Sequence, residues 1–388
     1  MEILHQTEKE GLLFVQYIED GERGCLFYGN DCDDYNQANI MEMEPHRLTM
    51  EYRHKGAVVG SCNGLVCTGE RNKDVNLVDP VQLCNPLTGE YVSLPKFKLT
   101  RKLAIHGNNC RNLASGFGYC HSTKEYKVVR IFSQKGDLRL VQVYTVGGKW
   151  RCIRPKLRYF NCASSGIYAN GSLHWLDQSY SQIPERKIVA FDLEHEKFYS
   201  VPMPTDATCF SVVRSVSYLL GGNNNLYLVH TENNCTDIWA YKLKRKKNSN
   251  AITSSNMKMR NQKYHKNSWQ WIKEFTIEGE AAENFKPFAI TRNNEVLLWY
   301  KSVFVYCYDP KTSTLNRLWG GNGMGCSHIE VIPHIPSIVS LKDLGETNVR
   351  SYRTATGPMT RKRKVINEEK VIAEKSFGLR KTKRSKKC

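Results

Sequence analysis

The chain has 388 residues, of which 40% are hydrophobic and 11% aromatic, so it can bury a core and is not disordered throughout. Its net charge of +18 is concentrated in two segments: residues 242–266 contribute +9 and residues 345–388 contribute +10, which leaves −1 for the rest. The folded body is therefore close to neutral, which argues against a nucleic-acid-binding face on it.

The first residues lack the features of a signal peptide, because the longest early apolar run is Leu12–Val15 and acidic residues flank it. No stretch approaches the roughly 18 apolar residues of a membrane-spanning helix. We therefore expect a protein of the nucleus or cytoplasm, not of a membrane, whose 14 cysteines are mostly reduced and buried. The closest cysteine pair, Cys62 and Cys67, lacks the spacing of zinc ligands, so we expect no metal and no cofactor.

Strand-like segments rich in Val, Ile, Tyr, Phe and Trp recur along the body, and each is bounded by Gly, Asn, Asp or Pro. The first is Leu12–Tyr17. A repeating unit then opens with a small-residue turn and a strand, and closes with an apolar strand, a turn and a second strand. The openings begin at residues 60, 116, 167, 221 and 289, and the closing pattern occupies residues 81–95, 188–198 and 305–315.

The spacings between these openings are 56, 51, 54 and 68 residues, and the widest one contains the basic segment 242–266. A period of about 40–50 residues with four strands per unit is typical of a β-propeller. Five units are visible, and residues 11–28 with Ile329–Leu344 are predicted to supply another. We therefore expect an all-β propeller of about six blades, although five to seven blades are compatible with the spacings. The alternative is a pair of β-sandwiches, although sandwiches show no such longer period.

The turns of the unit have a recognisable chemistry. Asn85-Pro86 and Asp309-Pro310 are predicted to start tight turns, because Pro fixes φ and the Asn or Asp side chain bonds its own backbone. Gly64 follows Asn63 in a hairpin position, where we expect a positive φ that glycine adopts without strain.

No motif of a known catalytic site is present, whether a GxSxG elbow, a P-loop or an HExxH helix, so we expect no enzymatic activity. The carboxylates that a hydrolase of this fold would need are interpreted as turn residues: Asp79, Asp192 and Asp309. His174 is interpreted as a hydrogen-bonded core residue. Five aromatic residues recur at similar points of the unit and are interpreted as packing between blades: Tyr119, Trp175, Tyr227, Trp299 and Tyr300.

Two segments fall outside the repeat. Residues 244–268 are predicted to form a disordered basic loop between two strands of one blade, bounded by Trp239 and by Trp269 and Trp271. Residues 345–388 are predicted to form a basic, mostly disordered tail with a short helix near 365–375. Two basic clusters in the tail predict a nuclear localisation signal for an importin, with a solvated tail as the alternative. The signal comprises Arg361, Lys362, Arg363, Lys364, Lys381, Lys383, Arg384, Lys386 and Lys387.

Several of these segments occur in an order that resembles the plant F-box-associated domain. In chain order they are GSCNGLVC at 60–67, LCNPLTGEYVSLP at 83–95, GFGY at 116–119, EYKVVRI at 125–131, VQVYTVGGKW at 141–150, NGSLHW at 170–175, IVAFD at 188–192, DIWAY at 237–241 and SIVSL at 337–341. The match covers about residues 55–344. We therefore assign residues 1–344 to one F-box-associated propeller domain.

The resemblance implies a kelch-like β-propeller that recruits a target protein to a Skp–cullin–F-box ubiquitin ligase and is not itself an enzyme. The partners would be an unidentified target and, through an F-box, a Skp-type adaptor and a cullin. Family members carry an F-box before this domain, and no helical run of that pattern lies upstream of Gly60. Three alternatives stay open: a decoy that binds targets without delivering them, a nuclear nucleic-acid-associated protein that uses its basic segments, and, more remotely, a propeller hydrolase.

Overall fold

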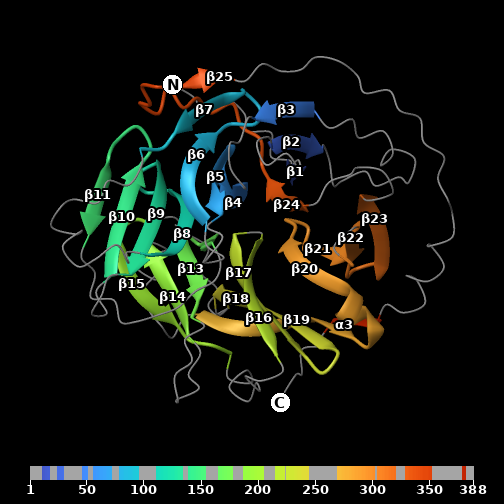
Figure 1. Ribbon diagram of the computed structural model, residues 1–388. Helices are drawn as coiled ribbons and strands as arrows, with labels where there is room; N and C mark the ends of the chain where they lie inside the picture. The colour runs from blue at the N-terminus through green and yellow to red at the C-terminus, as the bar shows by residue number, and fades with distance from the viewer. Residues whose placement is uncertain are drawn as a thin grey trace, which may run out of the picture.

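The structure, a computed structural model, describes residues 11–17, 24–29, 46–50, 56–71, 78–95, 111–133, 139–153, 165–177, 187–204, 215–222, 224–243, 269–301, 304–319, 328–351 and 378–381. Nearly all of these residues are in β-strands or the turns between them, and the one helix among them, α3 (Glu280–Asn284), has five residues. The strands form antiparallel units of four that stand around a common centre (Figure 1). We number these units blades 1 to 6.

Within each blade the four strands lie side by side from the centre outward. Blade 1 contains β24 (His328–His334) at the centre, then β1 (Gly11–Tyr17), β2 (Gly24–Gly29) and β3 (His46–Met50). Blade 2 contains β4 (Gly56–Cys62), β5 (Leu65–Arg71), β6 (Val78–Cys84) and β7 (Glu90–Ser93). Blade 3 contains β8 (Arg111–Cys120), β9 (Glu125–Ser133), β10 (Arg139–Thr145) and β11 (Trp150–Ile153).

Blades 4 to 6 repeat the same order. Blade 4 contains β12 (Ile167–Ala169), β13 (Ser172–Leu176), β14 (Ile188–Asp192) and β15 (Lys197–Val201). Blade 5 contains β16 (Val216–Gly222), β17 (Asn225–Glu232), β18 (Cys235–Leu243) and β19 (Trp269–Glu278). Blade 6 contains β20 (Phe285–Ile290), β21 (Val296–Tyr300), β22 (Phe304–Asp309) and β23 (Thr314–Trp319). Two short strands add to outer edges: β25 (Arg350–Ser351) pairs with β7, and β26 (Gly378–Lys381) pairs with β19.

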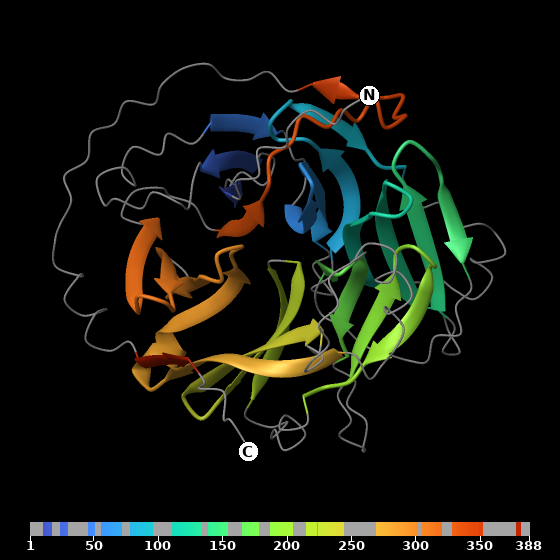
Figure 2. The same ribbon diagram turned by 180° about the vertical axis from the view of Figure 1, so that it is seen from behind.

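The innermost strands form a closed ring in which β24, β4, β8, β12, β16 and β20 each contact the next, and β20 contacts β24 again. The two opposite views show the blades arranged around this centre (Figures 1 and 2). The propeller predicted from the period is confirmed, with six blades in the described part of the chain. The β-sandwich alternative is wrong, because a sandwich has no such ring of inner strands.

The ring is closed by pairing strands from distant parts of the sequence. β1 pairs antiparallel with β24, from Gly11 opposite His334 to Tyr17 opposite His328. Blade 1 therefore takes its innermost strand from the far end of the domain, as predicted from residues 11–28 and 329–344. Strand alternation sends neighbouring side chains of β1 to opposite sides, so Leu12 packs toward blade 6 while Leu13 and Val15 pack toward blade 2.

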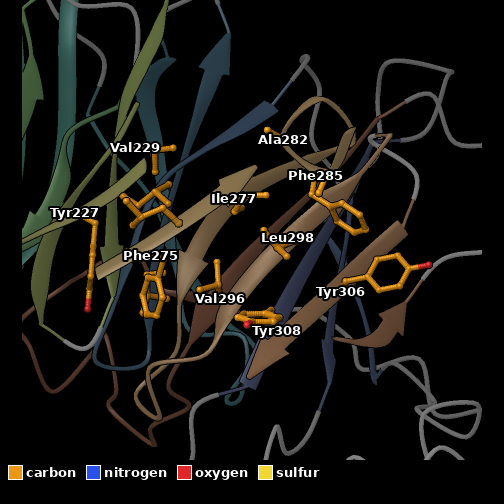
Figure 3. Packing of buried hydrophobic residues seen from close by; sticks show 14 of the residues in the cluster. Tyr227, Val229, Phe275, Ile277, Ala282, Phe285, Val296, Leu298, Tyr306 and Tyr308 are labelled. Atoms are coloured by element: carbon orange, nitrogen blue, oxygen red, sulfur yellow. The ribbon is translucent and has the colours of Figure 1, made fainter. Parts of the chain in front are cut away.

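Six hydrophobic clusters fill the six interfaces between neighbouring blades. Four of them join blades 2 and 3, 3 and 4, 4 and 5, and 5 and 6, and the last two pack blade 1 against blades 6 and 2. In the cluster of Figure 3, Tyr227 and Phe275 of blade 5 face Leu298 and Tyr308 of blade 6. Each blade thus buries both faces, and none can satisfy its apolar surface alone.

The strands on either side of the predicted basic loop belong to one blade. β18 and β19 are neighbouring strands of blade 5, and Leu243 pairs with Trp269 across them. Residues 244–268 and the predicted helix near 365–375 lie outside the described residues.

Gly64 confirms the positive φ expected of it, at 87°, in the turn between β4 and β5. A Cβ at this position would come within 2.4 Å of the Ser337 Cβ. The turn therefore requires glycine for two reasons, its backbone conformation and the close approach of another segment.

We expect Gly64→Ala to lower the melting temperature more than Gly279→Ala. Gly279 also has a positive φ, at 69°, but nothing lies within 4 Å of a Cβ placed there. The control therefore measures backbone strain alone, about 1 kcal/mol, and Gly64→Ala adds the clash with Ser337. Thermal unfolding of both variants tests this. Equal melting temperatures would show that the segment at Ser337 shifts away from the added methyl group without a loss of stability.

His334, at the end of the closing strand β24, is buried, and its Nδ1 lies 2.9 Å from Ser61 Oγ of blade 2. Burial lowers the pKa of the His334 imidazole from 6.5 to about 4. The folded protein therefore holds this ring in its neutral form, whereas an exposed histidine in the unfolded chain takes up a proton near its ordinary pKa.

This shift predicts a loss of stability in mild acid. The His334 contribution is fully present above pH 6.5 and is lost as the pH falls toward about 4, because the unfolded chain binds the proton first. The expected loss from this group is about 3 kcal/mol. Urea unfolding of the wild type and of His334→Gln across this pH window isolates it, since the variant should lack that part of the decline. Parallel pH curves for the two proteins would contradict the prediction.

Candidate protein-interaction surfaces

The ring has two faces, which differ in the connections that they carry. We call the first the turn face; among the described residues it holds the turns from the first to the second strand of blades 2 to 6 and from the third to the fourth strand of blades 2, 3, 4 and 6. Tight turns occur there at Asn63-Gly64, Asn85–Gly89, Asn170-Gly171, Leu193–Glu196 and Asp309–Ser313. Among the described residues, the opposite face holds Asn233-Asn234, between the second and third strands of blade 5, and α3, which joins blade 5 to blade 6.

The turn face is crossed by residues 335–351, which we call the C-terminal strap. The Asn85 side-chain amide donates to the backbone oxygens of Ser337 and Val339, at 2.8 and 2.7 Å. The Glu90 carboxylate accepts from the Leu341 N–H at 2.7 Å, and the Leu341 side chain is fully buried in the core between blades 2 and 3. The strap therefore ties the end of the closing strand to blade 2.

The strap continues to blade 3 and to the outer edge of blade 2. Glu346 Oε1 accepts from the Tyr144 hydroxyl and from the Gly147 N–H, each at 2.8 Å. Arg350 and Ser351 then pair with β7. Residues 345–351 fall within the tail predicted from the sequence, but the structure holds them against blades 2 and 3. The reason is that Glu346 accepts hydrogen bonds from Tyr144 and Gly147 of blade 3, which lie 202 and 199 positions away in the sequence.

A buried ion pair joins blades 3 and 4 at the turn face. The Lys127 side chain is 4% exposed, and its ammonium lies 3.0 Å from the Glu196 carboxylate and 2.8 Å from the Leu193 carbonyl oxygen. Arg151 bonds the same carboxylate. The pKa of Glu196 is lowered: burial acts to raise it, but hydrogen bonds from Arg151 and Lys127 outweigh that effect. Glu196 also has a positive φ of 54°, so the ion pair stabilises a strained turn.

We expect Glu196→Gln to destabilise the fold by about 3 kcal/mol, because it leaves the buried Lys127 charge without its main partner. Glu125→Gln is the matched control. The Glu125 carboxylate lies 3.4 Å from the same ammonium but is 41% exposed, and its loss should cost no more than about 1 kcal/mol. Equilibrium urea unfolding near neutral pH measures both, and equal costs would show that the Glu196 contact is not the one that compensates Lys127.

The opposite face offers exposed side chains where blades 5 and 6 meet. Val216, at the start of β16, is 60% exposed, and its partner Thr231 lies two residues before the turn at Asn233. Lys286 of β20 is exposed and its ammonium lies 5.3 Å from the ring centre of Tyr218. An exposed apolar side chain near an aromatic ring is a feature of protein-binding surfaces.

Two of the three aspartates, Asp192 and Asp309, are structural turn residues, as interpreted. Asp192 Oδ1 accepts from the backbone N–H groups of Glu194 and His195, at 2.8 and 3.0 Å. Asp309 Oδ1 accepts from the Lys311 N–H at 2.7 Å. These residues begin equivalent turns on the turn face of two blades, 4 and 6, that are not neighbours in the ring. Asp79 lies in β6 opposite Glu70, and no cluster of metal-ligand side chains occurs within the described ranges.

His174 and the recurring aromatic residues also lie in the core. His174 is buried, with its Nδ1 3.2 Å from the Ile167 oxygen. Trp175 is fully buried and donates from its indole to Ser115 O of blade 3 at 3.0 Å, so it packs between blades as predicted. The other four residues belong to inter-blade clusters as well: Tyr119, Tyr227, Trp299 and Tyr300.

Of the predicted localisation signal, only Lys381 is in the described part of the chain. It lies in β26 and pairs with Phe275 of β19. The strap contacts and the Lys127–Glu196 pair were not predicted from the sequence. One signal for the pair was available: Lys127 stands between the apolar residues Tyr126 and Val128 of a strand, and a lysine there needs a buried partner. No local pattern marked the strap contacts.

The described residues contain no helix long and apolar enough to cross a membrane. Their ring of six four-stranded blades, closed by strands from opposite ends of the domain, defines the chain as a β-propeller. The chain matches the family model of the F-box associated beta propeller domain over residues 25–334, and it belongs to that family. The resemblance to the plant F-box-associated domain is thereby confirmed.

Among its relatives is an F-box protein of Arabidopsis thaliana, 29% identical over 67% of this chain and 65% of that protein. An F-box/kelch-repeat protein of the same plant is 27% identical over 50% of this chain and 54% of that protein. The chain thus spans between about half and two thirds of the length of these relatives. Among solved structures, the chain is similar to a fucose-specific lectin from Aleuria aurantia, with 9% identity and a TM-score of 0.35 over 82% of this chain and 99% of the lectin. A likeness at this level carries no argument about function.

Proposed function

We propose that this propeller is a non-catalytic module that holds a target protein for ubiquitination by a ligase of the Skp–cullin–F-box type. Membership of the F-box-associated family supports the proposal, since the relatives are named F-box proteins. A rigid ring would act by raising the local concentration of the target near the transferring enzyme. The adaptor, the cullin and the target are all parts of this proposal.

The observation that carries the proposal is this family membership. The direction of β1 indicates which face the target would use. The first residue of β1, Gly11, pairs with His334, and the strap leaves β24 from that same end. Chain preceding β1 therefore joins the ring on the turn face, where the strap already covers parts of blades 2 and 3. A target bound on the opposite face, around Val216 and Lys286, would not compete with a segment attached there.

The faces supply a matched pair of substitutions. Val216, 60% exposed, lies on the opposite face, and Ile338, 61% exposed, lies in the strap on the turn face. We expect Val216→Asp to reduce recovery of the target at least about tenfold, because a charge is placed in an apolar contact, and Ile338→Asp to leave it unchanged. Affinity purification of the full chain from plant cells, with quantitative mass spectrometry and blots for adaptor and cullin, measures both.

Both variants should retain whatever adaptor and cullin the wild type recovers, since neither substitution touches β1. Loss of the target with Ile338→Asp and its retention with Val216→Asp would contradict the assignment of the faces. Failure to recover adaptor and cullin with the wild-type chain, while a target is recovered, would contradict the coupling to a ligase and favour a decoy.

A further inference from the structure

Aromatic rings and exposed cations alternate along the end of blade 6 that lies on the opposite face. Tyr300, the last residue of β21, pairs with Phe304, the first residue of β22, and their ring centres are 6.3 Å apart. The Lys301 ammonium lies 5.2 Å from the ring centre of Tyr300. The Arg317 guanidinium of β23 lies 4.3 Å from the ring centre of Phe304. Each of these two rings therefore carries a positive charge.

The inner strands of blades 5 and 6 add a third pair of the same kind, Lys286 over Tyr218. All three rings are partly buried and pack against the hydrophobic cluster between blades 5 and 6. All three cations are exposed. The core thus holds the rings in place, and the rings position the charges at the surface. We call the six residues the cation–ring row: Tyr218, Lys286, Tyr300, Lys301, Phe304 and Arg317.

The lysines of this row differ from another lysine that lies over a ring. Lys273 of blade 5 lies over Trp239, but its ammonium is paired with the Asp237 carboxylate at 2.7 Å. In the described part of the chain, no ion pair neutralises either lysine of the row. The exposed acids Glu278 and Glu283 belong to β19 and α3, not to blade 6. This end of blade 6 therefore presents positive charge that the folded chain leaves available to a partner.

The row has the length of a short extended segment and ends beside an apolar group. Neighbouring strands lie about 4.8 Å apart, so the distance from β20 to β23 is about 14 Å, which about four extended residues span. Val216 and Tyr218 are two residues apart in β16, so their side chains lie on the same side of that strand. The exposed Val216 thus adjoins the inner end of the row.

We propose that the cation–ring row binds an extended acidic segment of the target protein, with carboxylates paired to Lys286, Lys301 and Arg317 and an apolar or aromatic side chain against Val216. Charge complementarity with unneutralised cations selects the acidic segment. Nucleic acid fits less well, because the cations lie over the rings on which bases would stack. The inference rests on the proposed function and deepens it, since it names the chemistry of the target on the same face.

Binding is tested with the purified full chain at about 150 mM salt. Fluorescence anisotropy is measured with three labelled polymers: a random copolymer of glutamate and tyrosine, polyglutamate, and oligouridylate. The basic segments of the chain attract all three, so the readouts are the order of affinities and its change in each variant. We expect the copolymer to bind most tightly, because it combines carboxylates with apolar rings.

Lys301→Glu combined with Arg317→Glu should weaken copolymer binding at least about tenfold, because two attractive contacts become repulsive. Lys311→Glu combined with Lys342→Glu is the matched control, since both lysines are exposed on the turn face and the net charge changes by the same amount. The control should weaken binding less than about twofold, because salt screens distant charges. Equal losses in the two double variants would overturn the proposal, since the polymer would then respond only to net charge.

A milder variant, Lys301→Gln combined with Arg317→Gln, removes both charges without repulsion and serves if the charge reversal lowers the melting temperature. It should weaken copolymer binding about threefold. Unchanged binding in this variant would contradict the proposal, and tighter binding of oligouridylate than of the copolymer would overturn it in favour of nucleic acid. The purified chain contains no ligase, so this proposal can fail while the coupling to adaptor and cullin, measured in plant cells, still holds.

Discussion

The whole structure depends on the packing between neighbouring blades. A four-stranded blade of this protein is apolar on both sides, so it is stable only between two others, and the row of blades has to close on itself. The six buried clusters are the physical form of that requirement, one for each interface. Because side chains alternate along a strand, β1 serves two of them, with Leu12 on one side and Leu13 on the other.

The closed ring also explains where several of the polar and charged groups lie. These side chains join segments that hydrophobic packing alone would leave loosely connected. Asn85 and Glu90 hold the strap on blade 2, and Lys127 with Glu196 joins blade 3 to blade 4. Buried groups of this kind are favourable only when their partners are correctly positioned, so they stabilise one arrangement of the blades over others.

Much of the fold could be predicted from the sequence, because the unit repeats and its turns have local causes. Asp192 and Asp309 accept hydrogen bonds from the backbone two residues on, and Gly64 has the positive φ that its turn requires, so the conformations of these turns have local causes. The strap could not be predicted in this way. Asn85 is recognisable as a turn residue, yet its amide donates to residues more than 250 positions away, and no local pattern encodes such a partner.

The pairing of β1 with β24 has a consequence for folding during synthesis on the ribosome. A ribosome makes β1, β2 and β3 first, but the strand that covers the inner edge of β1 is almost the last part of the domain to emerge. During nearly the whole of synthesis this edge offers unpaired backbone groups and two apolar sides to anything nearby. A chain that stops before His328 would keep them permanently. Quality-control proteins that recognise exposed strand edges would thus bind truncated chains and release only those whose synthesis has included the closing strand β24.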